Sequence, residues 1–264
     1  MILRKLQTNS TKSGLLLRRC LENHQIHQNS VRSKTVSQWW NKIWGIFDGE
    51  IVKPPYNHCT QIGDPILRNK AAEVPVELIK SDEIQKLVAQ MKRVLRDFNL
   101  VGLAAPQIGV PSRVIVMEAS ERLLEKYPKN VYQTRQMSIL PLTTVINPEL
   151  KVKNFNIKTF PEGCASVCGY VGDVKRYEEI LLSGFNDKGD AIEMHLKGWS
   201  ARIAQHELDH LNGQVFVDIM EKKTFSCAAW EAVNFNGGQL HIPFYPVKQK
   251  FKVNLNPAKK SIVT

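Results

Sequence analysis

Hydrophobic residues recur at spacings of three and four in the first half of the chain. They are Ile84, Leu87, Val88, Met91, Val94, Leu95 and Phe98. This spacing places them on one face of an α-helix. Ser81 is a favourable N-cap residue, and Asp82 and Glu83 fall in the first turn, where the helix dipole favours acidic groups. We therefore predict an amphipathic helix over residues 82–98.

The pattern changes to short β-rich pieces between Ser112 and Phe185. The clearest candidate strands are residues 113–117, 143–146 and 179–185, and residues 118–140 form a polar excursion. The sequence Asn186-Asp187-Lys188-Gly189 predicts a turn into a further strand over 191–196, so that the two strands form a hairpin.

A second helix is predicted over residues 200–212, ending at Gly213 as a natural C-cap. It contains the run His206-Glu207-Leu208-Asp209-His210. Positions i and i+4 share a helix face, so both imidazoles can bind one metal ion, and Glu207 can carry a proton beside it. The alternative is a solvated polar helix face. The order of helix, strands and helix predicts an α+β fold in which antiparallel sheet packs around the metal-binding helix.

Composition and charge set the limits of the folded part. The chain has 264 residues, 43% of them hydrophobic, which is enough for one domain plus extensions, and no stretch approaches the length of a membrane span. Residues 1–45 carry eight basic residues and one acidic residue, which supply +7 of the net charge of +11 and leave +4 for the rest. This composition is typical of a mitochondrial transit peptide. A basic arm that binds RNA or an acidic partner is the alternative, but we predict no direct nucleic-acid binding.

The five cysteines form no paired framework, so we expect reduced thiols. Cys164, in Pro161-Glu162-Gly163-Cys164-Ala165-Ser166, is the best candidate for a third metal ligand, because a catalytic metal needs three protein ligands and one open position. The alternative for Cys164 is a buried core thiol.

A third run, Val101-Gly102-Leu103-Ala104-Ala105-Pro106-Gln107, follows the first predicted helix. Gly102 lets another chain approach the backbone, and Gln107 offers an amide donor on an otherwise apolar segment. The alternative is a tight connection from helix to strand with a surface glutamine.

Together the three runs resemble the motifs of the peptide deformylase family, in the family's order. They are residues 101–107, Glu162-Gly163-Cys164-Ala165-Ser166 and Gln205-His206-Glu207-Leu208-Asp209-His210-Leu211, and residues 62–68 resemble the family's amino-terminal segment. The resemblance covers residues 59–235. With the basic presequence it indicates the mitochondrial branch of the family. Leu100 and Ala165 depart from the common pattern, which affects the expected rate and specificity more than the chemistry.

The resemblance implies a metal site and a proton carrier. Cys164, His206 and His210 would bind one divalent ion, Fe²⁺ or Zn²⁺, with Co²⁺ or Ni²⁺ able to substitute. Glu207 would carry the proton. The Gln107 side chain and the backbone N–H of Ala165 would stabilise the oxyanion.

It also implies a substrate site. Val101 and Ile203 are candidate walls for a methionine side chain, although ordinary core positions explain them equally well. Gly102 and Gly163 would let the peptide add as an extra strand. The substrate would be an N-formylmethionyl peptide in the mitochondrial matrix, with the exit region of the mitochondrial ribosome as a candidate partner.

The implied organisation is a transit peptide and linker over residues 1–50, a catalytic domain over 51–235 and a C-terminal extension over 236–264. Two alternatives stay open at this stage. One is a zinc peptidase, and the other is a non-catalytic binding protein of mitochondrial translation that keeps the same fold.

Overall fold

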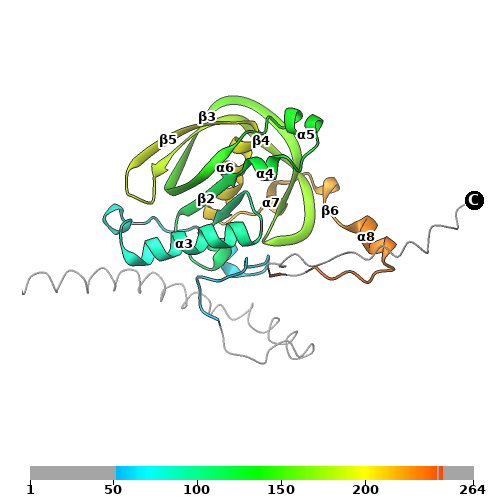
Figure 1. The fold of residues 1–264 in the computed structure, drawn as a ribbon, viewed down its shortest axis with the longest axis horizontal. Helices are drawn as coiled ribbons and strands as arrows, with labels where there is room; N and C mark the ends of the chain where they lie inside the picture. The colour runs from blue at the N-terminus through cyan, green and yellow to red at the C-terminus, as the bar shows by residue number, and fades with distance from the viewer. Residues whose placement is uncertain (1–51, 243, 246–264) are drawn as a thin grey trace, which may run out of the picture.

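A computed structural model describes residues 52–242, 244 and 245 of the chain (Figure 1). Its strands form one sheet in which every strand pair is antiparallel. The strand order is β1-β2-β3-β4-β5, and β6 pairs with β4 outside this path. The strands are β1 (Gly102–Ala104), β2 (Val114–Ala119), β3 (Leu140–Cys164), β4 (Val167–Phe185), β5 (Ala191–Lys197) and β6 (Ser226–Cys227).

Two longer helices accompany four short ones in this part of the chain. They are α3 (Asp82–Asp97), α4 (Glu121–Leu124), α5 (Lys129–Thr134), α6 (Gly198–Leu211), α7 (Phe216–Ile219) and α8 (Trp230–Phe235). The 3₁₀ turns are η1 (Pro65–Arg68), η2 (Val76–Leu78), η3 (Ala105–Ile108) and η4 (Lys222–Thr224). None of the helices in residues 52–245 has the length and apolar character needed to cross a membrane.

Strand β2, which lies between β1 and β3, separates two hydrophobic cores. Val114 and Val116 pack with the buried face of α3, whereas Ile115 and Met117 pack with α6. Alternate residues of a strand point to opposite faces, so one six-residue strand serves both cores. Helix α6 is therefore covered by sheet, and it is buried on almost every side. The predicted α+β fold with a central helix is confirmed.

The predicted helices and hairpin match the structure closely. Helix α3 ends one residue before the predicted boundary, and the Ser81 side chain accepts a hydrogen bond from the Ile84 N–H. Helix α6 begins two residues earlier than predicted, and Gly213 follows it with φ +76°, as its C-cap role requires. Gly189, with φ +82°, closes the β4–β5 turn.

Strands β3 and β4 are much longer than the sequence predicted. They form a continuous antiparallel ribbon, of which only residues 143–146 and 179–185 were expected. The outer half of β3 is mostly exposed, and its register shifts between Val152 and Asn154 and again before Ile157. Hydrogen bonds to β4, rather than burial of side chains, keep the outer half of β3 extended. The sequence of this half therefore lacks the alternation of hydrophobic and polar residues by which a strand is predicted.

Other differences lie in the connections. Residues 118–140 contain the last two residues of β2 together with α4 and α5, and ordered packing begins slightly before Cys59, because the Tyr56 N–H donates to the Ile108 carbonyl at 2.9 Å. The short strand β6 was not predicted. The predicted transit segment, residues 1–50, lies outside the described residues, as does most of the predicted extension over 236–264.

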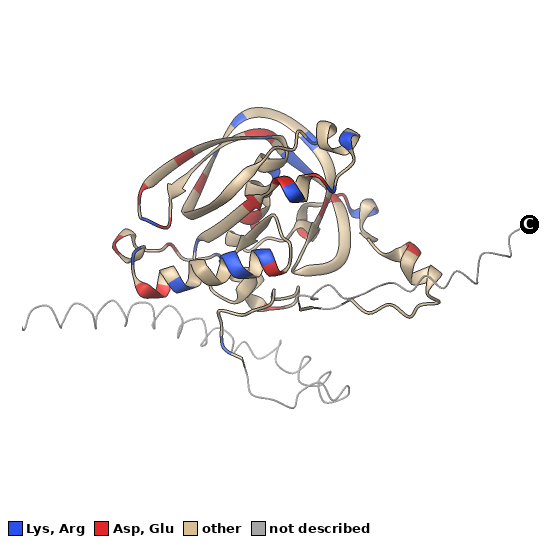
Figure 2. Cartoon of the chain, viewed as in Figure 1, with Lys and Arg blue, Asp and Glu red and all other residues tan. Residues whose placement is uncertain are grey.

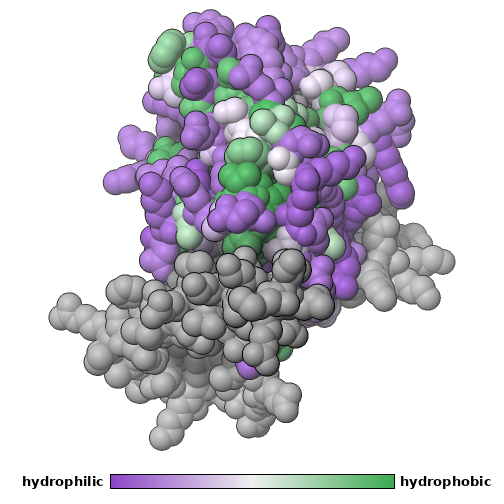
Figure 3. All heavy atoms as spheres, turned by 90° about the vertical axis from the view of Figure 1, so that its left-hand side faces the viewer, coloured by the Kyte–Doolittle hydropathy of each residue, from purple (hydrophilic) through white to green (hydrophobic). Residues whose placement is uncertain are grey.

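The described surface carries both charges. Acidic residues lie at both ends of α3 with basic residues between them, and the two charges are interspersed elsewhere (Figure 2). On the face toward the β4–β5 turn, small hydrophobic areas lie among hydrophilic ones (Figure 3). The excess positive charge of the chain thus belongs mainly to residues 1–45.

Candidate metal centre

Three potential metal ligands meet where the end of β3 touches α6. The ligand atoms of Cys164, His206 and His210 all lie within 4.8 Å of one another, and Cys164 Sγ is 3.2 Å from His210 Nε2. The two imidazoles sit one turn apart with their ring centroids 5.0 Å apart. The charge of His210 and hydrogen bonds to both histidines outweigh burial and lower the pKa of the Cys164 thiol well below its usual value. A thiolate and two imidazoles form a donor set that suits a divalent transition metal.

Glu162 orients one of these ligands. Its Oε2 atom is 2.9 Å from His206 Nδ1, which leaves Nε2 of that ring free for an ion. Burial alone would raise the pKa of Glu162, but hydrogen bonds to His206 and Arg176 lower it below its usual value. A carboxylate behind a histidine ligand fixes the tautomer and the ring orientation. Sequence reasoning gave Glu162 no role, because no strand was predicted there; at the end of β3 it precedes Cys164 by two positions and therefore shares its face.

Two buried arginines hold Glu162 in place. Arg176 donates to both carboxylate oxygens at 3.0 Å, and Arg202 donates to Oε1 at 2.7 Å. Arg176 also donates to Asp209 Oδ2 at 2.6 Å, which ties β4 to α6. The pair of arginines compensates the buried carboxylate, so the orientation of His206 depends on residues from two strands and one helix.

Glu207 is 3% exposed and faces the same site. Burial raises its pKa to about 7, while the neighbouring His206 and His210 oppose that shift. Its Oε2 atom has no hydrogen-bond partner among the described residues. A buried carboxyl oxygen without a protein partner fits a position beside a water molecule or a substrate.

Gly102 makes room for this carboxylate. A Cβ atom added at Gly102 would overlap the Glu207 side chain. The group that approaches the backbone at Gly102 is therefore the Glu207 side chain of the same chain. The other edge of β1, which is an edge strand of the sheet, pairs with no described strand.

Gln107 lies next to the Cys164 thiol. Its Oε1 atom accepts from the Ala104 N–H at 2.8 Å, and its Nε2 atom lies 3.5 Å from Cys164 Sγ and 3.3 Å from Ser166 Oγ. The amide is thus fixed with its donor group toward the site, and the alternative of a surface glutamine is wrong, because Gln107 is 2% exposed.

Residues 59–62 connect the two loops that carry these groups. The Thr60 N–H donates to the Gln107 carbonyl at 2.8 Å, and Gln61 Nε2 donates to the Ala165 carbonyl, also at 2.8 Å. The Ile62 N–H donates to the Ser166 carbonyl at 2.7 Å. Sequence reasoning did not find Gln61, since a single polar residue outside every predicted element carries no signal.

A cavity of about 210 Å³ opens onto this centre. Its lining includes the expected substrate and oxyanion residues Val101, Gly102, Gln107, Gly163, Ala165 and Ile203, together with His206 and Glu207. Leu100, whose side chain was expected to affect the substrate groove, lines it too, as do Tyr127, Arg135 and Trp199, which were not assigned to it from the sequence. Tyr127 and Arg135 belong to residues 118–140. No local sequence pattern predicted that this segment lines the cavity.

A partly buried Cys-His-His cluster beside the glutamate of an HExxH helix defines a metal-dependent hydrolase site. The sequence model of the polypeptide deformylase family matches residues 57–226, and the chain belongs to this family. The resemblance seen in the sequence is thereby confirmed. The family is metal-dependent, and removal of formyl groups from nascent polypeptides is the activity that its members share with this chain.

Named relatives agree with this membership. The chain is 41% identical to human "Peptide deformylase, mitochondrial" over 182 residues, which cover 69% of this chain and 75% of the relative. It is 43% identical over 163 residues to "Peptide deformylase 1A, chloroplastic/mitochondrial" of Arabidopsis thaliana, covering 62% of this chain and 61%, less than two thirds, of that relative.

Solved structures share the fold. A peptide deformylase from Acinetobacter baumannii with bound Met-Ala-Ser has a TM-score of 0.55 and 29% identity, covering 65% of this chain and all of that one. The enzyme from Synechococcus elongatus in complex with actinonin has a TM-score of 0.53 and 29% identity, covering 72% of this chain and 91% of that one.

Proposed function

We propose that this centre removes the N-formyl group from the initiator methionine of polypeptides made in mitochondria. The observation that carries the proposal is the meeting of Cys164, His206 and His210 with Glu207 in one cavity. The human mitochondrial relative and the basic composition of residues 1–45 support the compartment, with the matrix as the site of action.

Cys164, His206 and His210 would hold one divalent ion. The fit rests on the donor set, on the Glu162 contact that leaves His206 Nε2 free, and on the unpartnered oxygen of Glu207. Such an ion supplies Lewis-acid chemistry, which lowers the pKa of a water molecule and polarises a carbonyl group. We propose Fe²⁺ or Zn²⁺, with Co²⁺ or Ni²⁺ as substitutes, because thiolate and imidazole suit all four.

Glu207 moves the proton. Its carboxylate takes a proton from the attacking water, whose oxygen bonds to the formyl carbon, and later gives that proton to the departing amine nitrogen as the C–N bond breaks. The products are formate and a peptide with a free amino-terminal methionine. Gln107 Nε2 and the Ala165 N–H would donate to the oxyanion, and loss of one such donor typically costs about 3–4 kcal/mol in the barrier.

The peptide would lie between two backbone edges that line the cavity. Val101 and Gly102 supply one, and Gly163 supplies the other. An extended chain can pair with such edges through main-chain hydrogen bonds. Val101 and Ile203 then provide apolar walls for the methionine side chain.

The segments outside the catalytic domain would direct the protein into the mitochondrion and position it near its substrate. We propose that residues 1–50 act as transit peptide and linker, 51–235 as the catalytic domain and 236–264 as an extension. The exit region of the mitochondrial ribosome is the proposed partner, because the substrate is a newly made chain. Retention of the purified protein on mitochondrial ribosomes, compared with a variant that ends at residue 235, tests this contact.

The activity is tested with the full chain loaded anaerobically with Fe²⁺. Formate release from formyl-Met-Ala-Ser is measured for the wild type and for Glu207→Gln, with metal content determined for both. We expect release by the wild type and its loss in the variant at equal metal content. A folded, metal-loaded wild type that releases no formate would contradict the proposal, and cleavage of unformylated peptides would favour a peptidase instead.

A further inference from the structure

The segment between β2 and β3 brings a cation to the cavity wall. Arg135 follows α5 directly and lines the cavity, as does Tyr127 from the same segment. Tyr127 packs edge-on against Trp199 of α6, with the ring centroids 5.7 Å apart. This contact anchors the segment on the helix that carries the histidines, so Arg135 belongs to the wall that a bound peptide meets.

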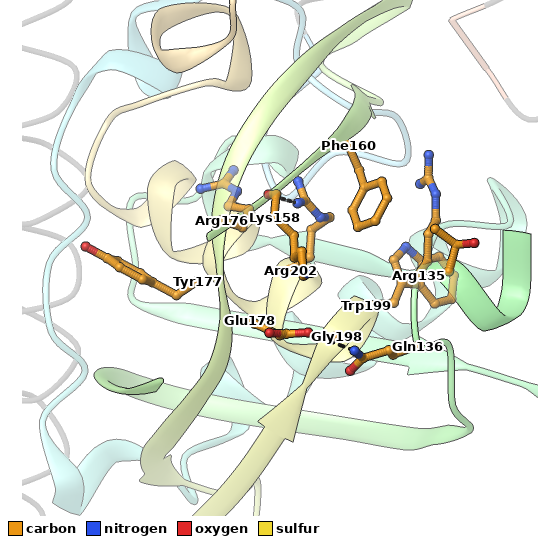
Figure 4. Close-up of a pocket in the computed structure, with 11 residues that line it drawn as sticks. Arg135, Gln136, Lys158, Phe160, Arg176, Tyr177, Glu178, Gly198, Trp199 and Arg202 are labelled. Carbon is orange, nitrogen blue, oxygen red and sulfur yellow. Dashed lines mark hydrogen bonds between the residues drawn. The ribbon is translucent and has the colours of Figure 1, made fainter. Parts of the chain in front are cut away.

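The Arg135 guanidinium is held by an aromatic ring. It lies 5.3 Å from the centroid of Phe160, and the Arg202 guanidinium lies 5.2 Å from the same centroid. Figure 4 shows Phe160 between the two arginines. Cation–π stacking on Phe160 fixes the guanidinium group but leaves its N–H donors available.

Those donors are almost unused within the described part of the chain. Arg135 makes one long hydrogen bond, from Nη1 to the Pro161 carbonyl at 3.5 Å. In residues 52–245 no carboxylate lies within 4.0 Å of it, whereas Arg202 pairs with Glu162. Glu178, which lines a neighbouring pocket together with Arg135, accepts from Gln136 Nε2 at 2.8 Å. Arg135 is thus the cation of the cavity wall that lacks a carboxylate partner in the described structure.

A half-buried guanidinium with free, fixed donors is suited to bind a carboxylate in a bidentate manner. This inference rests on the proposed function, in which the amino-terminal end of the formyl peptide binds in this cavity. We propose that Arg135 is a specificity-determining residue that binds a carboxylate within the first residues after the formylmethionine. The carboxylate can come from an Asp or Glu side chain or from the C-terminus of a short peptide.

The test uses the metal-loaded full chain and C-terminally amidated formyl-Met peptides. Glu, Gln or Lys is placed in turn at position 2, 3 or 4, and a Gln peptide with a free C-terminus tests the second source. We expect kcat/KM for the best-placed Glu peptide to exceed that of its Gln counterpart about three- to tenfold, mainly through KM, with Lys lowest. The preference should shrink as salt is added.

Arg135→Gln should abolish this preference by lowering kcat/KM for the Glu peptide to that for its Gln counterpart, mainly through KM, since the charged partner of the carboxylate is lost and no reacting group is touched. Arg135→Lys keeps the charge and should retain part of the preference. The matched control is Arg122→Gln, an exposed arginine of α4 that does not line the cavity, which should behave as wild type.

The outcomes separate the two proposals. Absence of formate release from every peptide contradicts the proposed function. Activity without a carboxylate preference at any position contradicts the role of Arg135. An equal loss on Glu, Gln and Lys peptides in Arg135→Gln would show that the arginine only supports the cavity wall.

Discussion

At the scale of single residues, the site depends on groups that do not themselves react. Glu162 is the clearest case, because it joins His206 to a pair of buried arginines. Outer partners of this kind set the orientation and basicity of a ligand. The sequence motifs predicted which residues are candidate metal ligands. The contact between His206 and Glu162, however, is seen only in the folded structure, where β3 packs against α6.

Glu162→Gln should therefore weaken metal binding by about 10–100-fold, because the amide cannot accept from His206 and from both arginines as the carboxylate does. Competition between the protein and a chelator of known affinity measures this. Glu178→Gln, which alters a half-buried acid on β4 that touches none of the metal-binding residues, is the control and should bind metal as the wild type does. Equal affinity in the two variants would remove Glu162 from the metal site.

Gly102→Ala should lower kcat by about 100-fold or more, because the added Cβ displaces the Glu207 carboxylate and small misplacements of catalytic groups are costly. Gly163→Ala is the comparison: its Cβ would meet Val171 Cγ1 at 3.3 Å, which a small side-chain shift can relieve. Steady-state rates on one formyl peptide, with Tm recorded for each protein, distinguish loss of function from loss of stability. A rate for Gly102→Ala close to that of the wild type would mean that Glu207 tolerates the crowding.

At the scale of elements, the ends of helices were predictable and the ends of strands were not. Helix α3 combines a repeating apolar face with a capping serine, so both its position and its start could be inferred. The outer half of β3 has almost no buried side chain, and its extended state depends on pairing with β4 across up to 30 residues of sequence, as between Lys151 and Leu181. Pairing over that separation is a property of the folded sheet, which a local pattern cannot reveal.

The contribution of the α3 N-cap to stability can be tested by comparing Ser81 with Ser120, the N-cap residue of α4. Ser81 accepts from the Ile84 N–H at 3.4 Å, whereas Ser120 stands at the same position of α4 without a side-chain hydrogen bond. Ser81→Ala should reduce the free energy of unfolding by about 1 kcal/mol, and Ser120→Ala by clearly less. Urea unfolding of the folded chain measures both, and neither variant should change kcat. An equal cost would show that the Ser81 contact adds no stability.

At the scale of the whole molecule, the metal centre lies next to the hydrophobic core that α3 forms with β2, here called the α3 core. Cys59 is 1% exposed and belongs to the α3 core, and burial raises the pKa of its thiol to about 12, with Cys164 and Glu207 adding to the shift. The thiol can react with an alkylating reagent only when the domain opens. Its labelling therefore reports opening of the fold, whereas Cys227 on β6 is half-exposed and needs no such opening.

Metal binding should slow this opening, because an ion that binds only the folded state stabilises it by mass action. At an ion concentration about 100 times the Kd the gain is about 2.7 kcal/mol, equivalent to roughly 100-fold slower labelling. Site-resolved mass spectrometry of iodoacetamide-treated protein, with and without chelator, follows both thiols. Chelation should accelerate labelling of Cys59 and lower Tm while Cys227 labels at one rate throughout. If metal protects Cys164 but leaves Cys59 unchanged, the ion closes only its own site, and the coupling between the metal centre and the α3 core is refuted.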